Sequence, residues 1–245
     1  MELAVSNLMS TPLMLFSLIV FPCMAALCLY LVRSPALQSL IVAAAATVLA
    51  AVALLLVPRV PFSLCLPSVF GIDPHAAISS AGFLLLCVIL YFGFRHHHPV
   101  IKVLSVSQII VLAVLEFFIK NGKHPADTFY GDDIALMLVL VASIAAALST
   151  MRLCLIPCIQ AGGDHPALTQ ASRHRFFALL LLCLGAFNGM LLANDMSFFY
   201  FFFEVITLCS FLLIAQKGTP AAEKKAVRTL SMTSLAGLVF LLAMT

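Results

Sequence analysis

Apolar runs of about 20 residues recur along the whole of this 245-residue chain, and short polar clusters separate them. Hydrophobic residues make up 63% of the sequence, and charged residues make up only 9%. An α-helix needs roughly 20 residues to cross about 30 Å of hydrocarbon, and its backbone satisfies its own hydrogen bonds there. The sequence therefore predicts an all-α fold, a polytopic transmembrane helix bundle.

Hydropathy predicts about eight spans. The segment 58–75 contains four prolines and predicts an external loop rather than a continuous helix. The first run is longer than the apolar part of a signal peptide, so we expect a membrane span there. The predicted spans are residues 12–32, 37–57, 76–94, 100–119, 134–156, 176–193, 196–216 and 227–245.

Lysine and arginine are distributed unevenly between the alternate loops. One set of loops holds most of them: Arg33, Arg95, Lys102, Arg152, Arg173, Arg175, Lys217, Lys224, Lys225 and Arg228. The other set holds Arg59, Lys120 and Lys123 together with most of the loop acids. Cytoplasmic loops are enriched in basic residues, so the sequence predicts an N-terminus outside and a multi-pass protein of the cell (inner) membrane.

One acid lies deep inside a predicted span. Glu204 follows Met196 by eight residues, which places it roughly 12 Å along the helix at 1.5 Å per residue. No basic residue lies within two turns on that helix. Intramembrane acids are costly and mark ion pathways or proton relays, so Glu204 is the main candidate residue of this sequence.

Helical periodicity places Ser197, Tyr200 and Thr207 on the same side of the helix as Glu204. Such a polar stripe faces a bundle interior or a hydrated path, as a proton relay would require. The alternative is an acid that only cross-links helices through hydrogen bonds. Glu116 has a simpler explanation, because Lys120 follows it by one turn and can pair with it.

The preceding span carries Gly185, Asn188 and Gly189, a small-residue face that favours close helix packing. A short connection joins this span to the Glu204 helix. We therefore expect the glycine face to pack against that helix, and Asn188 to approach the relay.

Other residue clusters give no metal, cofactor or catalytic site. Cys154 and Cys158 are one turn apart but have no further ligands, and Pro157 lies between them. His96, His97 and His98 precede Pro99 and are expected to line a solvated turn. A glycine-rich phosphate loop and cysteines at iron–sulfur spacing are absent from the sequence. We expect no autonomous enzyme and no nucleic-acid partner.

The C-terminal part resembles a known family. Its features are Arg175-Phe176-Phe177, Gly185-Ala186-Phe187-Asn188-Gly189, the aromatic run into Glu204 followed by Thr207-Leu208-Cys209-Ser210-Phe211, Ala226-Val227-Arg228 and Leu235-Ala236-Gly237. The segment Tyr130 to Ala147 contributes as well. These features resemble the antiporter-type proton-conducting subunits of respiratory complex I, Mrp antiporters and membrane-bound hydrogenases. They are most similar to the large membrane subunit of Ech-type energy-converting hydrogenases.

The resemblance implies an inverted-repeat fold that moves protons or sodium ions with energy from redox subunits of a hydrogenase-like or complex I-like assembly. Glu204 would be the family's helix glutamate, with Tyr200, Thr207 and Asn188 as neighbours in the relay. Lys224, Lys225 and Arg228 would lie at the cytoplasmic entrance, although topogenic charges explain them more simply. The expected division is N-terminal helices in residues 1–130 and the start of the antiporter-like module in residues 131–245.

The sequence also departs from the family pattern. Phe203 stands where relatives usually have tryptophan, the usual glycine pair reads Ala236-Gly237, and the given sequence ends at Thr245 inside an apolar run. The resemblance implies lysine helices after the glutamate, so we expect a longer product or a second polypeptide to supply them. The alternative function is a non-transporting membrane scaffold or a truncated fragment of such a subunit.

Overall fold

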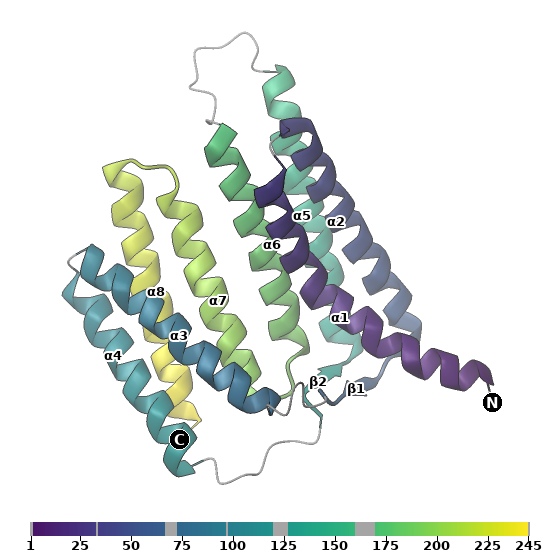
Figure 1. Cartoon of the computed structure of the whole chain (residues 1–245), viewed down its shortest axis with the longest axis horizontal. Coiled ribbons are helices and arrows are strands. Elements are labelled where there is room, and N and C mark those ends of the chain that lie inside the picture. Colours follow the sequence, from purple (N-terminus) through teal and green to yellow (C-terminus); the bar gives the residue numbers. More distant parts are fainter. Residues whose placement is uncertain are drawn as a thin grey trace. The chain divides into compact units, whose positions relative to one another are not determined.

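The computed structural model describes residues 2–32, 34–66, 73–96, 98–119, 127–159 and 170–244, and these form eight α-helices (Figure 1). A 3-10 turn at Val57–Arg59 follows the helix Pro35–Leu56, and a π-helix at Leu115–Ile119 continues the helix Pro99–Val114. Two short strands, β1 (Phe62–Leu64) and β2 (Phe129–Gly131), pair with each other. The helices are α1 (Glu2–Leu31), α2 (Pro35–Leu56), α3 (Pro74–Arg95), α4 (Pro99–Val114), α5 (Asp133–Ile159), α6 (Gln170–Leu192), α7 (Met196–Ala215) and α8 (Pro220–Ala243).

Proline begins four of these helices, α2, α3, α4 and α8. Proline has no N–H and a fixed φ, so it fits the first helical position, and it keeps the residue before it extended. In α8 the Thr219 hydroxyl also accepts a hydrogen bond from the Ala222 N–H at 3.2 Å. For this reason α8 starts at Pro220 and not near residue 227, where hydropathy placed it.

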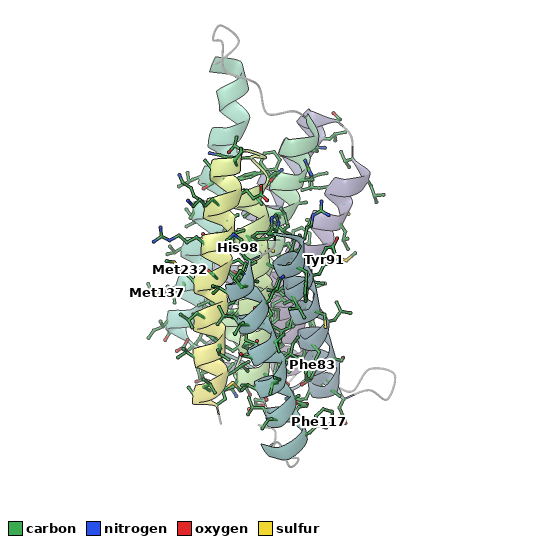
Figure 2. All side chains as sticks on the ribbon, turned by 90° about the vertical axis from the view of Figure 1, so that its left-hand side faces the viewer. Phe83, Tyr91, His98, Phe117, Met137 and Met232 are labelled. Carbon is green, nitrogen blue, oxygen red and sulfur yellow. The ribbon has the colours of Figure 1, made fainter. Side chains whose placement is uncertain are left out.

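The chain is a helical membrane protein. Within the described residues, five helical segments are long and apolar enough to cross a membrane: Pro74–Arg95, Pro99–Phe117, Arg175–Leu192, Met196–Ala215 and Pro220–Ala243. Three shorter apolar helical segments are Met14–Leu29, Leu40–Leu56 and Asp133–Ser149. Large apolar side chains lie exposed on the helices, among them Tyr91, Phe117, Met137 and Met232 (Figure 2). Such surfaces suit a lipid environment.

The helices divide into two compact units, which we call unit 1 and unit 2. Unit 1 comprises Met1–Phe62 and Gly131–Leu191, and unit 2 comprises Ser63–Tyr130 and Leu192–Thr245. The expected division after residue 130 coincides with one of the points where the chain passes between the units. Each unit nevertheless takes helices from both sides of that point.

In unit 1, α2 packs against α1 and α5. Small and branched side chains of α1 and α2 form a buried cluster with residues in the first half of α6. Small residues allow helices to approach closely in lipid. The cluster contains Ala25, Ala26, Leu29, Val42, Ala45, Phe177, Ala178 and Leu181.

In unit 2, α3 and α8 each pack against both α4 and α7, so the four helices surround a common interior. At one end His96 contacts Glu223, with 2.6 Å between Nδ1 and Oε1. At the other end His75 contacts Asp195, with 3.3 Å between Nδ1 and Oδ2. We call these the His96 end and the His75 end, and in Figure 2 α4 runs from His98 at the first toward Phe117 at the second.

Candidate functional site

Glu204 lies in the interior of unit 2. Its helix, α7, begins after Asp195, whose carboxylate accepts a hydrogen bond from the Ser197 N–H at 2.6 Å. The buried face of α7 includes Tyr200, Glu204 and Thr207. The Glu204 side chain has 0% of its surface exposed. The predicted polar stripe therefore faces the other helices of the unit rather than lipid.

An amide from α4 holds one oxygen of the acid. Gln108 Nε2 donates a hydrogen bond to Glu204 Oε1 at 2.7 Å, and Gln108 is itself fully buried. Tyr200 interacts with the same carboxyl group. Its hydroxyl also accepts a longer hydrogen bond, 3.4 Å, from Gln108 Nε2. Acid, amide and phenol thus form one buried polar group that joins α4 to α7.

Gly237 of α8 completes this group by leaving room for it. A Cβ atom at this position would lie 2.5 Å from Glu204 Oε1 and 2.6 Å from Gln108 Nε2. Both distances are shorter than a normal van der Waals contact. Only glycine lets α8 approach the hydrogen bond between the two side chains without displacing it.

Several oxygens in the interior of unit 2 have no hydrogen-bond partner among the described residues. They are Glu204 Oε2, Gln108 Oε1, Ser105 Oγ and Ser234 Oγ. Most other serine and threonine hydroxyls on these helices, such as Ser107 and Thr229, donate to a carbonyl one turn earlier. Ser105 and Ser234 do not, although both are fully buried. Buried unpaired oxygens are costly, and water or an ion commonly satisfies them.

Ser105 lies one turn from Gln108 along α4, and Ser234 lies one turn from Gly237 along α8, in both cases toward the His96 end. Thr207 lies one turn from Glu204 in the same direction and is buried. Three hydroxyl-bearing residues from three helices therefore follow Glu204 on this side.

Asn188 belongs to unit 1, where it has a partner of its own. Its Nδ2 atom donates a hydrogen bond to the Leu18 carbonyl at 3.1 Å. Pro22 follows Leu18 by four residues in α1 and has no N–H, so that carbonyl lacks its helical donor. Asn188 replaces the missing hydrogen bond.

Gly185, one turn before Asn188, lies against the same part of α1. A Cβ atom there would be 3.0 Å from the Ile19 carbonyl oxygen and 3.1 Å from both Pro22 Cγ and Cys23 Sγ. The expectation that Gly185 packs against the Glu204 helix is therefore wrong, because the glycine accommodates α1 instead.

The predicted entrance residues Lys224, Lys225 and Arg228 lie exposed in the first half of α8. Neighbouring Glu223 contacts His96, whose ring stacks on Phe92 and meets Phe211 edge to face. His96 thus packs at a helix junction, whereas a solvated turn was predicted. His97, and the side chains of Cys154 and Cys158, lie outside the residues that the structure describes.

Among the described residues, no three histidine, cysteine, aspartate or glutamate side chains lie together in a group that could hold a metal ion.

The sequence analysis missed two residues of the site, Gln108 and Gly237. Gln108 had a usable signal, since it is a lone amide inside an apolar span and shares a face with Ser105 and Leu112. Gly237 appeared only as part of a family motif. The need for glycine there comes from Gln108 of α4 and Glu204 of α7, which lie against it in the folded chain.

Comparisons of this chain with protein-family models, with curated proteins and with solved structures found no match.

Proposed function

We propose that this chain is a membrane subunit of a redox-driven ion pump, in which Glu204 passes protons across the membrane. The observation that supports this most directly is a fully buried carboxyl group with one oxygen held by an amide and the other without a hydrogen-bond partner among the described residues. A buried carboxylate without a countercharge is unstable, so such a group binds a proton or a cation.

The donor that Gln108 presents favours protons over sodium ions. Its NH₂ group faces Glu204 Oε1, whereas a bound cation would require oxygen ligands at that point. Tyr200, the other neighbour, carries a hydroxyl that can both give and take a proton. Glu204 and Tyr200 are the relay groups in this proposal, and Gln108 and Gly237 position them.

A path through unit 2 would continue from Glu204 toward the His96 end along Thr207, Ser105 and Ser234. Water between these hydroxyls would satisfy the unpaired Oγ atoms of the two serines. The distribution of basic residues supports a cytoplasmic location for this end, an N-terminus outside and eight membrane crossings in total. The exposed Lys224, Lys225 and Arg228 would then lie beside the path's entrance.

The energy source and the partners in this proposal come from the resemblance to antiporter-type subunits. Peripheral redox subunits would drive the pump, and further membrane helices from this product or another would complete the path. The assembly would belong to a hydrogenase-like or complex I-like class.

The Glu204→Gln variant tests the proposal, because glutamine keeps the shape of the side chain but cannot exchange a proton. We expect redox-driven proton uptake by inverted membrane vesicles to fall at least 100-fold while the assembled complex is retained on native gels. Glu223→Gln, in the same unit but exposed, serves as the control and should pump normally. Normal pumping by Glu204→Gln would instead support the scaffold function.

Ion identity is tested in the same vesicles. Proton movement should persist in sodium-free buffer and collapse with a protonophore. Dependence on sodium, with protons following only passively, would assign sodium as the transported ion.

A further inference from the structure

A small cavity lies inside unit 2, between Glu204 and the His75 end. Its volume is about 20 Å³. A cavity of roughly 10–15 Å³ is large enough to hold one water molecule. Apolar side chains form much of its wall, including Leu112 and Leu241. Four residues with polar side chains also line it: Ser79, Glu116, Ser197 and Tyr200.

Polar groups on four of the lining residues allow water to occupy this largely apolar cavity. A buried water usually makes about three hydrogen bonds, and Ser79, Glu116, Ser197 and Tyr200 bring polar groups from three helices to a wall that is otherwise apolar. Gly82 of α3 widens the space, since an added Cβ there would approach only Leu112 Cδ2, at 3.8 Å.

Tyr200 connects this cavity to the buried acid. Its side chain lines the cavity, and its hydroxyl meets Gln108 Nε2, which in turn holds Glu204. A continuous set of polar groups therefore leads from Glu204 through Tyr200 into the cavity.

Glu116 lies on the opposite wall, in the π-helix that ends the α4 segment. π-Helical turns are rare and often occur at functional sites. Lys120, the partner predicted for Glu116, lies outside the described residues. Glu116 lines the cavity together with Tyr200.

We propose that this cavity is a hydrated outer access route to Glu204, with Glu116 as a second proton-exchanging acid; this rests on the proposed function of Glu204. A proton leaving the Glu204 carboxyl goes to the Tyr200 oxygen as the Tyr200 hydroxyl proton passes to cavity water. That water gives a proton to the Glu116 carboxylate, which releases it to the outer solution. Each intermediate group gains one proton and gives up one.

Hydroxyl-radical footprinting of the intact complex by X-ray radiolysis tests whether the cavity contains water, independently of any transport. Radicals form from water beside the modified residue, so we expect oxidation of Tyr200 although its side chain is only 2% exposed. Leu84, which lies on α3 and is 67% exposed on the apolar surface, should remain unmodified. An unmodified Tyr200 would mean a dry cavity and would overturn the route.

A filling substitution tests whether the route is used. Gly82→Leu places a side chain in the cavity, and Ser80→Leu adds similar bulk to the exposed side of the same helix. We expect Gly82→Leu to remove the oxidation of Tyr200 and to lower proton pumping at least tenfold, and Ser80→Leu to change neither. If Gly82→Leu fails to assemble, Glu116→Gln replaces it and should lower pumping to a similar extent.

The two proposals fail differently. Normal pumping by Gly82→Leu, or by Glu116→Gln, would remove the outer route and leave Glu204 as the relay. Normal pumping by Glu204→Gln would remove the relay, and an oxidised Tyr200 would then show only a hydrated pocket.

Discussion

Units 1 and 2 each bury a polar side chain among apolar helices. In both side chains one atom makes a hydrogen bond and one oxygen, Asn188 Oδ1 or Glu204 Oε2, has no partner among the described residues, but only Glu204 can carry a charge. Asn188 in unit 1 donates to a backbone carbonyl that Pro22 has left without a donor. Glu204 in unit 2 receives one hydrogen bond from an amide and keeps a second oxygen without a partner among the described residues.

The comparison shows how a structural polar group differs from a functional candidate inside a membrane. Asn188 supplies the hydrogen bond that the Leu18 carbonyl lacks, and its amide group remains neutral. Glu204 does not replace a missing backbone hydrogen bond in this way. Residues from three helices nevertheless surround it: Tyr200, Gln108 and Gly237. Burying a carboxyl group, which can ionise, costs more than burying a neutral amide, so Glu204 is a better candidate for ion transfer than Asn188.

A pair of glycine substitutions gives the largest expected contrast between the units. In Gly237→Ala the new methyl group would overlap Glu204 Oε1 and Gln108 Nε2, which are the ends of movable side chains. We expect the complex to assemble and proton pumping to fall at least tenfold, because the hydrogen bond to the acid is displaced.

Gly185→Ala is the matched variant in unit 1. Its methyl group would meet the Ile19 backbone carbonyl at 3.0 Å, so the helices must move apart. We expect a stability loss of about 1–3 kcal/mol from overpacking, read as a lower melting temperature of the purified complex, with normal pumping per assembled complex. Equal pumping losses in both variants would mean that the glycines act only through folding.

A double-mutant cycle tests the structural role of Asn188. Asn188→Ala removes the donor to the Leu18 carbonyl, and buried hydrogen bonds between membrane helices contribute about 0.6 kcal/mol on average and up to about 1.7. Pro22→Ala restores an N–H to α1, so the cost of Asn188→Ala should nearly disappear in that background. Unfolding in mixed detergent measures the free-energy cost of Asn188→Ala with Pro22 and with Ala at position 22. If the two costs are equal, Asn188 does not compensate for the proline.

The smallest effect is expected at the His96 end. Glu223→Gln weakens the contact with His96, but Glu223 is 55% exposed, and exposed ion pairs contribute about 0–1 kcal/mol. Melting temperature and pumping should both stay near wild type. A large pumping defect would move the functional site toward this end of unit 2.

The sequence was sufficient for the features that depend on neighbouring residues. Apolar length predicted the helices, because backbone groups in lipid must pair within their own segment. Helical period placed Tyr200 and Thr207 beside Glu204, and the cost of an intramembrane acid made Glu204 the main candidate. Proline positions also carried information, since Pro220 rather than hydropathy sets the start of α8.

Contacts between distant segments were decided by the tertiary structure alone. Gln108 and Gly237 reach Glu204 from two other helices, and a helical pattern specifies which side of a helix is buried but not which helix covers it. The same ambiguity led to Gly185 being assigned to the wrong neighbour. The sequence determined that Glu204 is buried in a membrane. Only the packing of α3, α4, α7 and α8 determined which groups surround it. Apolar helix faces are chemically alike, so the fit between their shapes decides which helices pack together.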